Sequence, residues 1–228
     1  MGLVRPMFNA TYFAGIVRAS CGDLVGALEV AMQVLADVER FELEVYRPRA
    51  HNLLSWLWRE LGEPSRALDH AHQALVTARL PNGVVEAEPA AHARLQLAES
   101  ALQLGDDAAA AEWLADLREH ALDPVAFGWR IDLHRLDVQA RMDPSCADEL
   151  LERAGARGSA KYRSLALAHL GRNDEAHMVA AGVGAELLIA HVAPGAPAAA
   201  AIDRLAARLP PELREGFVHR GACSTRRR

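Results

Sequence analysis

Between residues 51 and 79 the apolar positions form two helical stripes separated by a short polar break. The first stripe recurs at helical spacing and ends at Gly62, and the second runs on one face from Ala67 to Ala78. Glycine is favoured just past a helix end, and proline, here Pro64, is tolerated in the first turn of the next helix. The segment therefore predicts two antiparallel helices joined by a tight turn.

The step from a turn glycine to an alanine five residues later recurs along the chain. It joins Gly22 to Ala27, Gly62 to Ala67, Gly105 to Ala110 and Gly171 to Ala176. Seven residues before these glycines stand the small residues Gly15, Ser55, Ala98 and Ser164. Small residues at a helix crossing let two backbones approach closely. A further unit fits before Ala147, where Asp143 and Pro144 replace the glycine turn. In this unit Arg135 stands at the position that holds a small residue in the others.

The sequence thus predicts an all-α protein of about five antiparallel helix pairs. The expected helices are 7–20 and 24–39, 45–61 and 65–79, 87–104 and 107–120, 125–141 and 145–154, and 159–170 and 173–190. An Ala/Pro linker at 195–198, a capping helix at 198–208 and a short helix at 211–219 are expected to follow. In domain terms, we expect a repeat array over 1–194, linker and C-terminal capping helices over 195–219, and a basic disordered tail over 220–228.

Composition favours helix and excludes some function classes. Only 5% of the 228 residues are aromatic and alanine is abundant, which favours helices over strands. A net charge of −5 does not suggest nucleic-acid binding. The three cysteines lie far apart, as is typical of a reducing compartment, and the longest weakly polar stretch, 178–194, is too short to span a bilayer. We therefore expect a cytoplasmic, soluble protein.

The repeated pattern resembles the tetratricopeptide repeat over about residues 7–190. The matching columns are the small residue of the first helix, the turn glycine and the small residue of the second helix, with Trp58 four residues before one turn. The long, variable units and the ending from Arg204 to Phe217 are similar to the C-terminal repeat regions of bacterial signal-transduction ATPases, adenylate cyclases and transcriptional regulators. The resemblance implies a right-handed α-solenoid whose first helices line a concave groove, with a C-terminal capping helix.

Catalytic and metal-binding motifs are not found. The only lysine, Lys161, does not stand in a Gly-Lys-Ser/Thr phosphate loop, and neither HExxH nor Gly-x-Ser-x-Gly occurs. His70 and His72 are two apart, so they point away from each other on a helix. We therefore expect no catalytic residue, no cofactor and no metal.

The resemblance instead gives candidate partner-binding residues, at three groove columns of the first helices. They are Asn9, Tyr12, Arg49, Asn52, Trp56, His92, Glu99, Trp129, Asp132 and Lys161. Arg49, Asn52 and Trp56 form the cluster of most interest, because arginine pairs with carboxylates through two parallel bonds and exposed Trp and Arg are common in binding hot spots. In the alternative interpretation Trp56 is a core residue and Arg49 is merely solvated.

We expect a non-catalytic scaffold that binds a protein or peptide partner in the groove. The alternative is a sensory or regulatory repeat fragment of a signal-transduction ATPase or transcriptional regulator, whose catalytic and DNA-binding parts are elsewhere. An enzyme or small-molecule binder built on helical hairpins has only the scattered histidines in its favour. No direct nucleic-acid or membrane partner is expected, and the sequence leaves the oligomeric state open.

Overall fold

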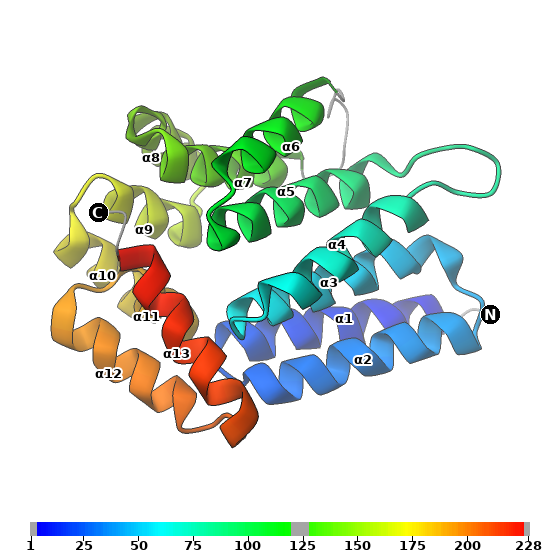
Figure 1. The fold of residues 1–228 in the computed structure, drawn as a ribbon, viewed down its shortest axis with the longest axis horizontal. Helices are drawn as coiled ribbons and strands as arrows, with labels where there is room; N and C mark the ends of the chain where they lie inside the picture. The colour runs from blue at the N-terminus through cyan, green and yellow to red at the C-terminus, as the bar shows by residue number, and fades with distance from the viewer. Residues whose placement is uncertain (1–3, 120–127, 226–228) are drawn as a thin grey trace. The chain divides into compact units, whose positions relative to one another are not determined.

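The structure, a computed structural model, describes residues 4–119 and 128–225. This part of the chain is all-α, with thirteen α-helices that pack mostly against their neighbours in sequence (Figure 1). The α-helices are α1 (Val4–Ser20), α2 (Leu24–Arg40), α3 (Arg47–Glu60), α4 (Pro64–Thr77), α5 (Ala87–Leu104), α6 (Asp107–Glu119), α7 (Gly128–Met142), α8 (Ala147–Ala156), α9 (Ala160–His169), α10 (Asn173–Gly182), α11 (Glu186–Val192), α12 (Gly195–Ala206) and α13 (Pro211–Thr225). Two short 3₁₀ helices are η1 (Glu44–Tyr46) and η2 (Pro144–Cys146).

The chain divides into two compact units. The described residues of the first unit are 4–19, 23–119 and 209–225, so it holds helices up to α6 and also α13. The second unit holds 20–22 and 128–208, with helices α7 to α12. The all-helical architecture and the packing of sequential helix pairs are confirmed, while the right-handed solenoid stays a prediction.

The small residues predicted for the first and second helices of a pair meet where the two helices cross. In the first unit, Ser55 Oγ of α3 donates a hydrogen bond to the carbonyl oxygen of Ala67 in α4, at 2.8 Å. In the second unit, Ser164 Oγ of α9 donates in the same way to the carbonyl oxygen of Ala176 in α10, at 2.7 Å. All four residues are fully buried. The repeat register inferred from the sequence is therefore confirmed at these two crossings.

Gly15 of α1 shows the same close packing by a different measure. A Cβ added there would lie 3.2 Å from Leu53 Cδ2 and 3.3 Å from Val30 Cγ1. These distances are tighter than ordinary carbon contacts, so α1 approaches α2 and α3 at a distance that favours glycine.

The turn glycines and the second helices follow the predicted pattern as well. Four turn glycines adopt left-handed backbone angles, with φ of +85° at Gly22, +82° at Gly62, +85° at Gly105 and +74° at Gly171. After each of the first three turns, buried residues recur at the same spacing: Ala27, Ala31, Val34 and Val38 in α2, Ala67, Ala71 and Ala74 in α4 with Ala78 directly after it, and Ala110, Leu114 and Leu117 in α6. The second helices thus present small or branched side chains on one face.

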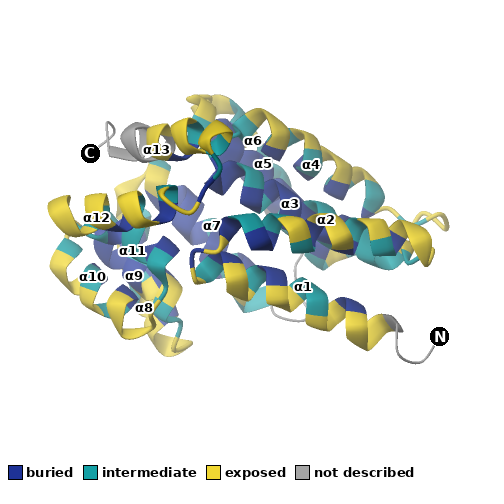
Figure 2. Ribbon diagram, turned by 90° about the horizontal axis from the view of Figure 1, so that it is seen from below, coloured by how far each residue is buried: buried dark blue, intermediate teal, exposed yellow. Residues whose placement is uncertain are grey.

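Helix α5 is buried along most of its length (Figure 2). It packs against α3, α4, α6 and α13. Because neighbours surround it, even polar residues such as Gln96 and Ser100 are buried. The core of the first unit is therefore centred on this helix.

Helix α13 returns to the first unit through a single aromatic anchor and a backbone contact. Phe217 is fully buried, whereas most other described side chains of α13 are exposed. The backbone of Gly216 lies against the turn between α3 and α4, where a Cβ added to Gly62 would be 2.0 Å from the Gly216 carbonyl oxygen. Two facing glycines therefore permit this docking.

The fourth helix pair, α7 and α8 in the second unit, departs from the repeat rule as its sequence indicated. The turn contains η2, and the Asp143 side chain accepts a hydrogen bond from the Ser145 N–H at 3.0 Å. Arg135 occupies the expected small-residue position, remains partly exposed and donates to Asp132 at 2.6 Å. An arginine at that position is accommodated because it reaches solvent and a carboxylate.

Several predicted boundaries are wrong. The helix expected at 173–190 is two helices, α10 and α11, because the chain turns at Gly184 with φ +64°. The expected linker at 195–198 is the first turn of α12, where proline costs no hydrogen bond. The last helix continues from 211 to Thr225 rather than ending at 219. The junction of the predicted helices 107–120 and 125–141, and the arginines at 226–228, lie outside the described residues.

No helix in the described ranges is both long enough and apolar enough to cross a membrane.

Replacing Ala67 with leucine tests the close crossing of α3 and α4. Ala67 is fully buried, so the larger side chain should overpack the crossing and lower the free energy of unfolding by about 1–3 kcal/mol. Urea denaturation measures the change, with the exposed Gln73→Leu on the same helix as the matched control. Equal stability of the two variants would contradict the crossing.

A second pair of variants isolates the docking of α13. Gly62→Ala and Gly171→Ala both place a side chain at a left-handed backbone angle, which costs about 1–2 kcal/mol. Only Gly62→Ala also collides with Gly216, since no atom lies within 4 Å of a Cβ at Gly171. We expect faster hydrogen exchange over residues 211–219 in Gly62→Ala alone. The same exchange rates in both variants would rule out the glycine contact.

Candidate functional site

A polar hollow of about 420 Å³ opens in the first unit beside two of the predicted groove residues. Its lining residues are Arg5 and Asn9 of α1, Val45 and Tyr46 of η1, Arg49 of α3, and Glu86 from the segment before α5. Asn9 and Arg49 come from successive helix pairs and were both predicted from the groove columns. The hollow offers guanidinium, amide and carboxylate groups around a small apolar surface.

Arg49 is held in place by acidic neighbours. Its Nη2 donates to Glu88 Oε2 at 2.6 Å, its Nη1 donates to the Val45 carbonyl oxygen at 3.0 Å, and Nη1 lies 3.6 Å from Glu86 Oε2. Burial alone would lower the pKa of Arg49, but the carboxylates, chiefly that of Glu88, outweigh it and raise the pKa. Burial raises the pKa of Glu86, and Arg49 opposes that shift in part. Arg49 thus lines the hollow as a charged side chain whose position is fixed by its partners.

Asn52 and Glu99 lie inside the molecule, where an open groove was expected. Asn52 Nδ2 donates to the carbonyl oxygen of Pro89 at 2.9 Å. Glu99 pairs with Arg59 at 2.8 Å, and Arg59 also donates to Gln96. All these side chains are buried, because the first helices α3 and α5 pack against each other along this column. Arg49 and Asn52 therefore do not form one exposed cluster.

The remaining groove candidates of the first unit are half-buried. Trp56 Nε1 donates to Glu60 Oε1 at 3.1 Å, one turn along α3. Tyr12 stacks on Phe8 with ring centroids 6.2 Å apart and packs against the apolar core of the unit. His92 lies 4.0 Å from Glu88. Tyr12 thus packs against the core, Trp56 is bonded within its own helix, and the binding roles predicted for these residues stay predictions.

The candidates of the second unit form separate structural contacts. Trp129 packs against the cluster that includes Leu133 and Tyr162. Asp132 accepts from Arg135 at 2.6 Å and from Arg153 at 2.5 Å. Lys161 is exposed, with its Nζ 5.1 Å from the centroid of the Tyr162 ring. The binding roles predicted for these three residues stay predictions.

The structure brings together a histidine pair that the sequence analysis missed. His51 Nδ1 of α3 and His70 Nδ1 of α4 are 3.0 Å apart, so one ring donates and the other accepts. Burial, followed by His70 and then Arg47, lowers the pKa of His51 to about 4. Burial also lowers the pKa of His70, against the opposing effect of Asp69. Both rings are therefore neutral at neutral pH.

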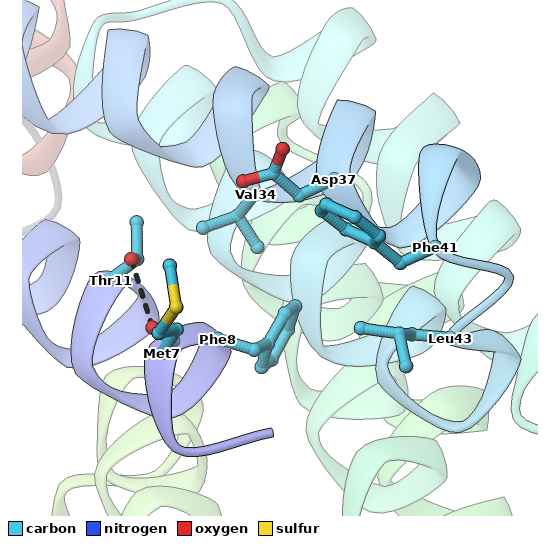
Figure 3. Close-up of a pocket in the computed structure, with 7 residues that line it drawn as sticks. All are labelled: Met7, Phe8, Thr11, Val34, Asp37, Phe41 and Leu43. Atoms are coloured by element: carbon cyan, nitrogen blue, oxygen red, sulfur yellow. Dashed lines mark hydrogen bonds between the residues drawn. The ribbon is translucent and has the colours of Figure 1, made fainter. Parts of the chain in front are cut away.

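An apolar pocket of about 90 Å³ lies between the beginning of α1 and the end of α2 (Figure 3). Its lining residues are Met7, Phe8 and Thr11 of α1, Val34 and Asp37 of α2, and Phe41 and Leu43 of the following segment. Phe8 and Val34 are buried, while Met7 and Phe41 are exposed. The pocket is suited to a small apolar group.

The rest of the described chain offers no metal centre, since no three or more His, Cys, Asp or Glu side chains in it could jointly hold an ion. No model of a known protein family matches the chain, and no similar curated protein or solved structure is found. The relationship to the tetratricopeptide repeat therefore stays a resemblance of sequence pattern.

The histidine pair predicts a pH dependence of stability. Below pH about 6.5 the unfolded chain protonates His51 while the folded chain resists protonation until about pH 4, so stability falls as the pH falls through this window. Because the ring is partly exposed, water screens the effect, and we expect a loss of about 1–2 kcal/mol. His51→Gln should flatten the slope in urea titrations between pH 7 and about 4.5. The exposed His72→Gln on α4 is the control, and an unchanged slope in His51→Gln would show that the pair does not titrate in this way.

Proposed function

We propose that this protein is a non-catalytic scaffold that binds a peptide segment of a partner protein in the polar hollow of its first unit. The observation that carries the proposal is the convergence of Arg5, Asn9, Arg49 and Glu86 on one open hollow. These residues come from α1, α3 and the segment before α5, so three separate parts of the chain build it.

The chemistry of the hollow suits a peptide backbone. A peptide presents both N–H donors and carbonyl acceptors at short intervals. Asn9 supplies a donor and an acceptor on the exposed face of α1, and the guanidinium of Arg5 supplies donors. Glu86 adds a carboxylate to the same lining, while Val45 and Tyr46 provide apolar surface. A volume of about 420 Å³ falls within the usual range of ligand sites.

The fixed position of Arg49 favours binding over catalysis. Its bonds to Glu88 and to the Val45 carbonyl oxygen are made before any ligand arrives, so little side-chain freedom is lost on binding. A general acid or base would need a group that exchanges protons near neutral pH. Arg49 is held charged and therefore acts as an electrostatic wall.

Variants at the exposed rim test this function. Arg5 and Asn9 are exposed, so Arg5→Glu and Asn9→Ala should fold normally and reduce partner retention at least about fivefold in affinity capture from native cells. Arg157→Glu, an exposed arginine of the second unit, makes the same charge change away from the hollow and should leave retention unchanged. Equal recovery of the captured partner by all three variants would exclude the hollow as the binding site.

A further inference from the structure

The outer face of α1 is apolar and open. Met7, Phe13 and Val17 are 67%, 55% and 60% exposed, and the exposed alanines Ala10 and Ala14 lie between them in the sequence. The Phe13 and Tyr12 rings meet edge to face, with centroids 5.5 Å apart. Large apolar residues that follow one face of a helix are uncommon on monomeric proteins, so this surface calls for an explanation.

The exposed residues form one stripe. Met7, Ala10, Ala14 and Val17 are spaced by three, four and three residues, the interval at which side chains line one side of a helix. The other side of α1 faces its own unit, where Phe8 is buried. Helix α1 is therefore apolar on two sides but packed on only one.

The repeat register allows the exposed positions of α1 to be compared with the equivalent positions of α3. Gly22 and Gly62 are equivalent turn glycines 40 residues apart, so each position of α1 corresponds to one in α3. The exposed residues Ala10, Phe13, Ala14 and Val17 thereby correspond to Ala50, Leu53, Leu54 and Leu57 of α3, which are 0–3% exposed. The same columns are open in α1 and covered in α3.

In α3 two of these positions, Ala50 and Leu53, face the preceding helix pair. Ala50 belongs to the core cluster with Phe8 of α1 and Val34 of α2, and Leu53 lies beside Gly15 of α1. Helix α3 also packs against α2 directly. The equivalent columns of α1 are therefore shaped to receive a helix in the position that α2 holds beside α3.

We propose that the outer face of α1, formed by Met7, Ala10, Phe13, Ala14 and Val17, is a docking surface for an amphipathic helix of a partner protein. The partner helix presents an uncharged stripe to this face and acidic residues at its edges. An apolar helix face is more stable in water when another helix covers it.

The basic residues of α1 favour a partner helix that carries acidic residues. Helix α1 carries Arg5 and Arg18 and has no acidic residue, and the half-exposed Arg18 already pairs with one carboxylate, that of Asp23, at 3.1 Å. Helix α2, which packs on α1 within the chain, carries the three acidic residues Glu29, Asp37 and Glu39 and one basic residue, Arg40. A second copy of α1 would place arginines beside arginines, so like charges disfavour a symmetric pairing. None of the five residues of this face lines the polar hollow, although Arg5 of the same helix does.

The test uses a helix-stapled peptide of residues 24–40, the sequence of α2, as the probe for the full chain. Fluorescence anisotropy of the labelled peptide measures its affinity. We expect saturable binding that Val17→Glu weakens at least about tenfold. Val76→Glu on α4 introduces the same charge at a residue that is 68% exposed elsewhere on the first unit, and it should bind like the wild type. Phe13→Glu provides a second variant of the docking face, and circular dichroism melting checks that each variant is folded.

Two results would overturn the proposal. One is a peptide that does not bind, or that binds folded Val17→Glu and Phe13→Glu as tightly as the wild type. The other is a chain that sediments as a dimer by itself and becomes monomeric in Val17→Glu, because a second copy would then be the occupant. Loss of peptide binding in Val17→Glu with normal partner capture would separate this surface from the polar hollow.

Discussion

The helix pairs of this protein depend on one close crossing, at which a small residue of the first helix meets the backbone of the second. Ser55 bonds to the Ala67 carbonyl oxygen and Ser164 to that of Ala176, so two pairs in different units use the same contact. A crossing this close fixes the distance between the helices and the direction in which the turn glycine must leave the first helix. The buried columns of the second helices follow from it, because their spacing is counted from the same turn.

The same crossing fixes where polar groups lie. His51 and His70 each stand about one helical turn farther from the turn glycine than Ser55 and Ala67, which brings their rings together. On the next side of α3, the column of Arg49, Asn52 and Arg59 meets α5. Polar side chains at that seam either reach the polar hollow, as Arg49 does, or are buried with partners.

The helix pairs could be predicted because three local signals agree: apolar periodicity, turn glycines and the small columns. The break at Gly184 was missed because the alanines of residues 173–190 keep a helical spacing through it. Asn9 and Arg49 both line the polar hollow, and their predicted binding roles stay predictions, whereas Asn52 and Glu99 were expected on an open surface and are buried. Their burial depends on how closely neighbouring first helices approach, and no local pattern encodes that distance. The histidine pair could have been found by counting outward from the crossing on both helices.

The ion pair between Arg59 and Glu99 gives the stack of first helices an order. The buried alanine faces of the second helices are nearly interchangeable. With these faces alone, one helix pair could pack against several others with similar energy. A buried guanidinium and carboxylate 2.8 Å apart tolerate no such exchange, because a shifted or substituted neighbour would leave a charge unpaired inside the protein. The contact thus restricts which helix can pack against α3. A protein built from similar helix pairs needs such selective contacts as much as it needs apolar surfaces.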